Sequence, residues 1–542
     1  MINAAVLWFH ENSFLSANPC KKARNPVYFR NTPYPKFDEK ERVSVMKCCF
    51  LLQRQFAYIG HYLAKELKEK HGIEDFCGYV YLRSSYRFLK DQKDISYSTL
   101  LLDQDIHETW REEKIDIAYL KDLENRIGLP NMWPYLIADR VIMQEQLQRE
   151  YPHDHLRYTH EELLKMLQVR AKAIDEMMKK ERPDIVFGIQ PGGLGSMLLY
   201  HIARSYGART MYVVPSNLQN RYLLSEDYTT FTSVDTAVRE QADELLSSED
   251  GAWARGHLEA FRKKPVPNFE KTTPIHQPVT RTQQLGFLKP WRAYRALSEI
   301  TRTIVHHVKN EDRRDYDYIH PFWQNVDLLK RKLRNLRGNN DLYDRFEPSE
   351  SFAFFPLHYE PELSLLVLAP QFTDQIHLIG QIARALPVGM TLCVKEHPAM
   401  AQYRPRAFYK QIKKIPNIKL LSPTLSGFDV TPHAKLVTTI TGTVGWEACL
   451  FGVPVISFGR QNFNALTNVT HCTDIEKLSH VIRERLNEKR YDEKNVLVYL
   501  AALHRHSFEI DLKQLWEEET DQGKRRQGIA PLANALAFAI KS

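Results

Sequence analysis

The pattern of hydrophobic and polar positions predicts a helix-rich first part of the chain, followed by an α/β rhythm. Between residues 40 and 175, apolar side chains recur three and four positions apart in VSVMKCCFLLQRQFAYIGHYLAKELKEKHG and in EELLKMLQVRAKAIDEMMKKERPD, which predicts amphipathic helices. The compact apolar run DIVFGI at 184–189 is typical of a buried parallel strand. A glycine-rich turn and a helical pattern follow in QPGGLGSMLLYHIARSYGA, and RTMYVVPS supplies the next strand. Residues 170–216 therefore predict a doubly wound α/β unit.

Residues 250–350 interrupt this rhythm. Prolines and charges alternate in RKKPVPNFEKTTPIHQPVTR, and a basic helical pattern then runs through DLLKRKLRNLRGNND, whose Lys/Arg face is expected to be solvated rather than bound to a membrane. From 351 the α/β rhythm resumes, with strand patterns in SFAFFPL, MTLCVKEHP, IKLLSP, KLVTTI and VPVISFG, and helical patterns in FTDQIHLIGQIARALP and VGWEACLFG. We expect an N-terminal α/β domain over 1–260, a helical and proline-rich connector or insertion over 261–350, a Rossmann-like nucleotide-binding domain over 351–480 and C-terminal helices over 481–542. The last helices are expected either to close the second domain or to cross back to the first.

Composition narrows the class of protein. The 542 residues carry 74 basic and 66 acidic side chains, and the resulting net charge of +8 is compatible with acidic ligands or an anionic surface without implying nucleic acid. The seven cysteines are few and odd in number, and no CxxC pair or His/Cys cluster at zinc spacing occurs, so a reducing compartment is expected. With no basic-then-apolar leader and no run of 18 apolar residues, the chain is predicted to be cytoplasmic, with peripheral contact to the inner face of the membrane left open.

The run LCVKEHPAM at 392–400 raises the question of why an apolar strand ends in Lys395, Glu396, His397 and Pro398. Proline cannot continue a ladder and favours an extended residue before it, so His397 is expected where the strand leaves the sheet. Ligands of open α/β sheets bind at that edge. The competing interpretation is a loop with a solvated Lys-Glu pair and a chance histidine.

The strongest signal is KLVTTITGTVGWEACLFGVPVISFG at 435–459. A predicted strand ends at Thr441, Gly442, Thr443 and Gly445, and a helix that carries Glu447 begins at once. Glycines allow close approach of the backbone, and a helix N-terminus offers free N–H groups and partial positive charge, a combination that favours phosphate. Glu447 can accept hydrogen bonds from sugar or ribose hydroxyls. The alternative is a tight strand-to-helix turn without a ligand.

Together, the KxHP turn and TGTVGWEACLFGVPVISFG resemble the donor-binding half of GT-B glycosyltransferases of the capsule polysaccharide biosynthesis type, a group similar to bacterial Kdo and sialic acid transferases with an HP motif. FAFFPLHYEPELS at 352–364 resembles the start of that half. The resemblance is specific over 350–460, suggestive over 180–222 and absent over 1–130 and 260–345. It implies two Rossmann-like domains facing a central cleft, with His397 binding the nucleotide phosphate or assisting its departure, residues 441–445 cradling it and Glu447 holding the ribose or donor sugar. Independently of the resemblance, Lys395 lies near His397 in the sequence and is expected to help neutralise that phosphate. Serine often stands in that family where this chain has threonine at 441 and 443.

Other candidates lie at neighbouring turns. His358, in FPLHYEPE, follows another predicted strand of the same sheet and is a candidate donor contact, whereas the two glutamates after it can equally be solvated helix-start residues. Gln190, Gly192 and Gly193 form a glycine-rich strand-to-helix turn on the expected acceptor side, without the spacing of the dinucleotide fingerprint. Asp139, in an Asp-Arg pair on an apolar helix, is a candidate catalytic base, and a structural ion pair is the alternative. The DQD at 103–105 and DYD at 315–317 mimic a metal-binding DxD without a strand before them, and the IHPFW at 319–323 repeats the His-Pro pair without its context, so no metal site is predicted.

The resulting functional hypothesis is a metal-independent glycosyltransferase that needs no cofactor and uses a nucleotide sugar, with CMP-Kdo or a related acidic sugar as first choice. The expected partners are that donor and a glycan or glycolipid acceptor of a bacterial surface polysaccharide, with a polysaccharide assembly complex left open. The alternative enzymes are a CDP-polyol phosphotransferase and a UDP-sugar epimerase of the same architecture. A non-catalytic glycan-binding subunit is the alternative of another class, which a complete phosphate site would argue against.

Overall fold

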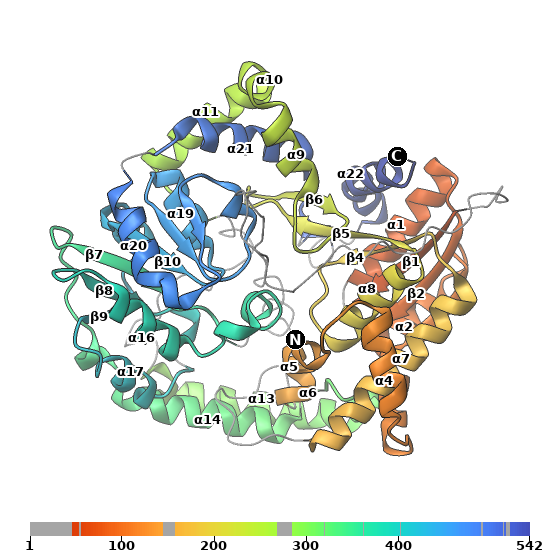
Figure 1. Ribbon diagram of the computed structural model, residues 1–542. Coiled ribbons are helices and arrows are strands. Elements are labelled where there is room, and N and C mark those ends of the chain that lie inside the picture. Colours follow the sequence, from red (N-terminus) through yellow and green to blue (C-terminus); the bar gives the residue numbers. More distant parts are fainter. Residues whose placement is uncertain are drawn as a thin grey trace.

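The chain folds into two twisted sheets, each covered by helices, with a pair of helices between them in sequence (Figure 1). The computed structural model describes residues 46–53, 56–144, 158–267, 285–318, 320–360, 362–401, 403–488, 491–512, 514–515 and 521–541. The prediction of two Rossmann-like sheets joined by a helical connector is confirmed.

The N-terminal sheet has seven strands in the order β13-β6-β5-β4-β1-β2-β3. Strands β1 to β5 pair in parallel, whereas β6 and β13 run antiparallel at one edge. The strands are β1 Lys47–Leu52, β2 Asp75–Val80, β3 Tyr97–Leu102, β4 Ile185–Ile189, β5 Arg209–Pro215, β6 Arg221–Ser225 and β13 Phe508–Glu509. The helices of this half are α1 Phe56–His71, α2 Arg83–Asp91, α3 Asp103–Glu108, α4 Ile117–Arg126, α5 Trp133–Ala138, α6 Arg140–Gln144, α7 His160–Glu181, α8 Leu194–Ser205, α9 Thr232–Glu240, α10 Ala242–Ser247 and α11 Glu249–Lys263.

The expected strands β4 and β5 and helices α7 and α8 are confirmed, but the helical prediction is wrong at three strands. KCCFLL forms β1, which is paired on both sides, and β2 and β3 also lie in the region expected to be helical. Cys48, Phe50 and Leu52 pack in the core on the side of α1, and Cys49 and Leu51 pack on the side of α7 and α8. Because both faces of β1 are buried, its residues show no polar alternation, and period alone cannot distinguish such a strand from a helix.

The C-terminal sheet has six parallel strands in the order β12-β11-β10-β7-β8-β9. They are β7 Phe352–Pro356, β8 Thr391–Lys395, β9 Ile418–Leu421, β10 Leu436–Thr439, β11 Val455–Ser457 and β12 Val469–His471. All five strand patterns expected after residue 350 are confirmed, and β12 is additional. The helices of this half are α15 Leu363–Leu366, α16 Gln375–Ala385, α17 Arg406–Ile412, α18 Gly427–Val430, α19 Thr443–Phe451, α20 Leu478–Asn487 and α21 Glu493–His506.

The end of the chain crosses back to the N-terminal sheet. Helix α21 packs against α11, β13 pairs with β6, and α22 (Gln522–Lys541) packs against α1 (Figure 1). Leu532 and Leu536 of α22 share a core with Leu63 of α1. Of the two alternatives for the last helices, crossing back is the one observed, while the predicted domain limits stay predictions.

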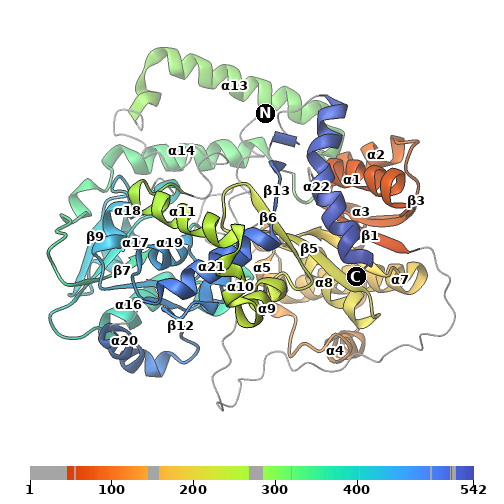
Figure 2. The same cartoon turned by 90° about the horizontal axis from the view of Figure 1, so that it is seen from above.

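The connector contains two long helices, α13 (Pro290–Lys309) and α14 (Pro321–Arg337). They lie side by side along one edge of the molecule, with α13 outermost (Figure 2). The basic helical pattern in DLLKRKLRNLR is confirmed as part of α14.

Candidate functional site

The two turns singled out in the C-terminal half lie at the same edge of its sheet. Strand β7 lies between β8 and β10, and all three run in parallel. Their carboxyl ends therefore lead into neighbouring turns: the HYEP turn after β7, the KEHP turn after β8 and the TGTVG turn after β10. Because ligands of such sheets bind outside the carboxyl ends of the strands, this edge is the candidate site.

The TGTVG turn ends in a helix N-terminus that no side chain caps. Gly442 is the N-cap of α19, and no side-chain hydrogen bond satisfies that end of the helix. A Cβ on Gly442 would lie 2.9 Å from Thr439 Oγ1, and one on Gly445 would lie 2.7 Å from the ring of Phe463. Both glycines are thus required by the close packing of the turn. The N–H of Gly445 donates to the carbonyl of Gly442 at 3.0 Å, and the N–H groups of Thr443 and Val444, which no side chain caps, remain available to an anion.

His358 braces this turn from the end of β7. The ring Nε2 of His358 accepts a hydrogen bond from the backbone N–H of Thr441 at 3.0 Å. The backbone N–H of His358 donates to Gln375 Oε1 at 2.8 Å. Burial, together with the nearby Arg404, lowers the pKa of His358 to about 3. The imidazole is therefore neutral and its Nε2 is an acceptor, so His358 positions the TGTVG turn. Thr441 is also engaged within the turn, because its hydroxyl donates to the carbonyl of Ser364 at 3.1 Å.

A buried ion triad joins the HYEP and KEHP turns. Arg404 is 1% exposed and donates to Glu396 at 2.5 Å, to Glu360 at 3.0 Å and to the carbonyl of His358 at 2.6 Å. Burial lowers the pKa of Arg404, but the two carboxylates outweigh it and hold the pKa above its usual value. Glu396 and Glu360 are both buried, so neither a solvated Lys-Glu pair nor a solvated Glu360 describes this edge. Sequence reasoning missed Arg404, which lies outside both motifs.

His397 lies directly after β8, as predicted, and is half-buried. The backbone N–H of His397 donates to Glu396 Oε1 at 2.6 Å. The ring Nδ1 accepts from the backbone N–H of Ala399 at 3.3 Å. The ring lies edge-on to Tyr359, with 5.9 Å between the centroids. Since Nδ1 accepts, the proton of a neutral ring is on Nε2, which is the nitrogen that can donate to a ligand.

Lys395 and Glu447 are two buried groups of opposite charge beside these turns that attract each other, and the Lys395 ammonium donates to the carbonyl of Glu396 at 3.2 Å. They are 7% and 9% exposed. Burial lowers the pKa of Lys395 to about 8, against the attraction of Glu396 and Glu447. Burial raises the pKa of Glu447 to about 7, against the attraction of Lys395. Each group therefore changes charge near neutral pH, as expected where a ligand binds or a proton moves.

The glycine-rich turn of the N-terminal half differs from the TGTVG turn because its N–H groups are already used. Ser196 Oγ accepts from Gly192 at 3.0 Å and from Gly193 at 3.1 Å, and Asp139 accepts from Leu194 at 2.9 Å. The end of α8 is thus internally capped and offers an anion little. A Cβ on Gly192 would lie 2.4 Å from Leu363 of α15, so this turn contacts the C-terminal half directly.

Asp139 is buried and accepts hydrogen bonds from three backbone N–H groups. Besides Leu194, they come from Val141 at 3.1 Å and Ile142 at 3.0 Å, so one carboxylate caps both α6 and α8. This gives Asp139 a structural task that neither the proposed base nor the proposed ion pair anticipated, and its role as a base stays a prediction.

Two buried glutamines follow strands of the two sheets. Gln190 comes after β4 and Gln461 after β11, they are 5% and 0% exposed, and within the described ranges neither side-chain amide has a hydrogen-bond partner. The loop of Gln461 also contacts the N-terminal half, because Asn217 donates to Asn462 at 2.9 Å. Unpaired buried amides are costly, and such groups mark places where a ligand or water is bound.

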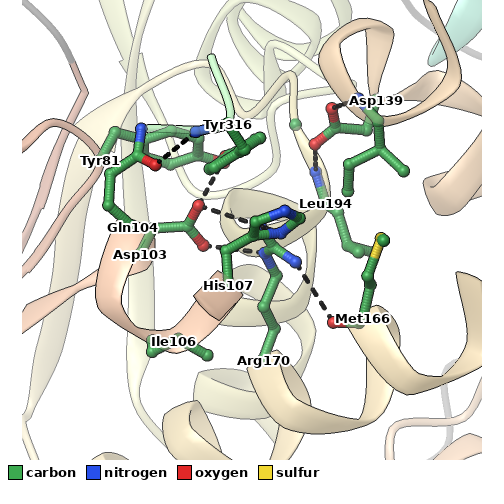
Figure 3. A network of polar contacts seen from close by, with 12 residues as sticks. Tyr81, Asp103, Gln104, Ile106, His107, Asp139, Met166, Arg170, Leu194 and Tyr316 are labelled. Carbon is green, nitrogen blue, oxygen red and sulfur yellow. Dashed lines mark hydrogen bonds and ion pairs between the residues drawn. The ribbon is translucent and has the colours of Figure 1, made fainter. Parts of the chain in front are cut away.

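A second polar cluster fastens the connector to the N-terminal sheet (Figure 3). Asp103, directly after β3, accepts from Arg170 Nε at 2.9 Å and from the Tyr316 hydroxyl at 2.5 Å, and Gln104 donates to Asp317 at 2.5 Å. The DQD and DYD segments, which were discounted as metal sites, thus contact each other. No group of three His, Cys, Asp or Glu side chains suited to a metal occurs within the described ranges, and the predicted metal independence stays a prediction.

Comparison with solved structures finds remote similarity. The chain is similar to KpsC of Thermosulfurimonas dismutans, a beta Kdo 2,7 transferase, at 12% identity and a TM-score of 0.34, over 63% of this chain and 83% of that one. It is similar to the UDP-GlcNAc 2-epimerase of Methanocaldococcus jannaschii at 13% identity and a TM-score of 0.22, over 85% of this chain and 100% of the epimerase. These TM-scores are too low to carry any of the named functions over. No curated protein matches the sequence.

A family model described as capsule polysaccharide biosynthesis protein matches residues 260–502. This range contains the KEHP and TGTVG turns, so the resemblance based on them is confirmed. It also contains residues 260–345, so the expectation that the connector lies outside the resemblance is wrong. Residues 260–502 of this chain are therefore similar to the capsule polysaccharide biosynthesis family.

Proposed function

We propose that the chain is a glycosyltransferase that moves a sugar from a nucleotide donor to a surface polysaccharide or its lipid-linked precursor. The observation that carries the proposal is the uncapped N-terminus of α19 beside the buried pair of Lys395 and Glu447. The contrast with α8, whose first N–H groups are bonded to Ser196 and Asp139, supports a phosphate site in the C-terminal half rather than in the N-terminal one. The family match over residues 260–502 supports the polysaccharide pathway.

The donor phosphate is placed against the first turn of α19, where free N–H groups and the helix dipole favour negative charge. His397 donates from Nε2 to a phosphate oxygen and thereby stabilises the departing nucleotide. The Lys395 ammonium contributes further positive charge near the phosphate. Glu447 accepts from hydroxyls of the ribose or the donor sugar. The resemblance to CMP-sugar transferases makes CMP-Kdo the first donor to test, and no metal or cofactor takes part in the proposal.

The acceptor is placed at the carboxyl edge of the N-terminal sheet, near the turn of Gly192 and the unpaired amide of Gln190. The contact of Gly192 with Leu363 supports this placement, because it brings the acceptor-side turn against the donor-side half. The donor would then react where the two carboxyl edges meet. We propose that this takes place in the cytoplasm, at or near the inner face of the membrane.

The test is a calorimetric titration of the whole chain with CMP, CDP and UDP. Wild type is compared with His397→Ala and with His480→Ala, which removes an exposed histidine of α20 as matched control. We expect CMP to bind wild type and His480→Ala alike, and to bind His397→Ala at least tenfold more weakly, since one charge-assisted hydrogen bond is worth about 1.5–3 kcal/mol.

Three outcomes would contradict the proposal in different ways. Selective binding of CDP points to a polyol phosphotransferase, and selective binding of UDP points to an epimerase or a UDP-sugar enzyme. Binding of polysaccharide without any nucleotide leaves a glycan-binding subunit. If CMP binds, transfer from CMP-Kdo in the presence of EDTA tests both the donor sugar and the independence from metal.

A further inference from the structure

Exposed apolar side chains are concentrated on the two connector helices. Of the seventeen large hydrophobic side chains that are exposed in the described ranges, twelve lie on α13 and α14. Figure 2 shows α13 as the outermost element of that edge, with α14 alongside it. Scattered exposed apolar residues are ordinary, but a contiguous group on neighbouring helices marks an interaction surface.

Helix α14 turns its polar side toward the protein and its apolar side away from it. Gln324, Asp327, Arg331 and Arg334, spaced three and four apart, are buried or half-buried. The Arg331 guanidinium lies 4.5 Å from the centroid of the Tyr403 ring, and Arg334 donates to the Tyr403 carbonyl. A helix at the surface of a globular protein normally buries its apolar side, so this orientation is reversed.

The opposite side of α14 carries Phe322, Leu329, Leu333 and Leu336, which are 59%, 57%, 57% and 41% exposed. Their spacing of seven, four and three residues places them on one face of the helix.

Helix α13 repeats the arrangement. Trp291, Tyr294 and Leu297, then Ile304 and Val308, recur at helical spacing and are each at least half exposed. Ala296, Ile300, Thr303 and His307, spaced four, three and four apart, form the half-buried side of the helix. The apolar side of α13 is therefore also turned away from the protein.

The charge on these helices identifies the kind of partner. By sequence, α13 carries four Lys or Arg and one Glu, and α14 carries five Lys or Arg and one Asp, so their net charges of +3 and +4 make up +7 of the chain's +8. Apolar faces flanked by cations and by tryptophan, tyrosine and phenylalanine match the interface of an anionic bilayer. Because Arg331 and Arg334 lie on the inner side of α14, the cations that remain exposed among the described side chains are Arg295, Arg302 and Lys309 on α13 and Lys330 and Arg337 on α14. A second copy of the chain would bring these like charges against each other.

We propose that the exposed apolar faces of α13 and α14 dock the protein on an anionic lipid bilayer. In the described ranges no helix is long and apolar enough to span a membrane. The inference concerns where the transferase of the proposed function works. Its test uses no sugar donor, so either idea can fail without the other.

The experiment is flotation of the full chain with vesicles of phosphatidylcholine and phosphatidylglycerol at 3:1, and with vesicles of phosphatidylcholine alone. We expect flotation with the anionic vesicles, weaker binding to the neutral ones, and loss of binding as salt is raised. Each cation near an anionic surface contributes about fivefold to partitioning, so the double variant Arg295→Gln, Lys330→Gln should bind about 25-fold more weakly. Its matched control is Lys179→Gln, Lys435→Gln, which removes two exposed lysines elsewhere.

The apolar part is tested with Leu329→Ser, Leu333→Ser against Val388→Ser, Phe538→Ser, which removes two exposed apolar side chains outside the helices. The first pair should bind at least tenfold more weakly, and the second pair should bind as wild type does, with circular dichroism confirming that all variants fold. Equal flotation of all variants, or none by wild type at low salt, would overturn the proposal. So would a wild-type dimer in sedimentation that the first pair dissociates, because a second copy would then cover the face.

Discussion

Lys395 and Glu447, buried beside the TGTVG turn, lead to a quantitative prediction of how the free energy of unfolding depends on pH. Replacing Glu447 by glutamine keeps the size of the side chain and removes its charge. The carboxyl has a pKa of about 7 in the folded protein and an ordinary value of 4.5. Between these values the folded protein holds a proton that the unfolded chain has lost, so the free energy of unfolding falls as pH rises through this window.

The size of the effect follows from the two pKa values. Going from pH 5 to pH 8, the titration of Glu447 should lower the free energy of unfolding of wild type by about 2.5 kcal/mol. Lys395, with a pKa of about 8, stays largely charged over most of this range. Without Glu447 the pKa of Lys395 should fall further, so the unfolded chain binds a proton that the folded variant has lost. The stability of the variant then rises with pH, which adds to the difference between variant and wild type.

Urea unfolding of wild type and Glu447→Gln at pH 5, 6, 7 and 8 measures the effect, because groups whose pKa the substitution does not change cancel in the difference between the two proteins. The stability of the variant minus that of wild type should rise by about 2–3 kcal/mol across the series. Glu484→Gln, which removes an exposed carboxylate of α20, controls for the loss of a surface charge in the same half. A difference that stays flat, or that falls with pH, would show that burial does not raise the pKa of Glu447 and that the carboxylate is ionised across the series.

Three further substitutions test other parts of the site. Arg404→Met leaves two buried carboxylates without their shared partner and should cost about 3–5 kcal/mol in urea unfolding at pH 7, whereas a loss below 1 kcal/mol would refute the triad. Gly445→Ala places a methyl group against the ring of Phe463 and should cost about 1–3 kcal/mol and weaken CMP binding, while Gly427→Ala, which meets open space, should leave nucleotide binding unchanged. Asp139→Asn should destabilise the protein by about 1–3 kcal/mol through weaker capping of α6 and α8, and should reduce kcat less than tenfold. A hundredfold loss of kcat at unchanged stability would instead make Asp139 the catalytic base.

The sequence alone was sufficient where the signal is local. The strand, turn and helix of residues 436–451 were predicted because a short apolar run, glycines at a tight turn and a helical pattern follow one another within sixteen residues. His397 was placed at a strand end because proline acts on its nearest neighbours. The parallel order of the C-terminal strands then follows from their alternation with helices.

The tertiary structure decided whatever depends on residues far apart in the chain. β1 was mistaken for helix because burial on both faces removes the alternation that reveals a strand, and only the helices packed on it settle the matter. Arg404 is 44 residues from Glu360, and Arg170 is 67 residues from Asp103, so neither ion pair leaves a local pattern. The outward apolar side of α14 was also invisible, because an amphipathic period shows that a helix has two faces but not which of them the rest of the protein covers. The sequence by itself determined the local turns and helices, and long-range packing determined which of their side chains are buried, paired or left for a partner.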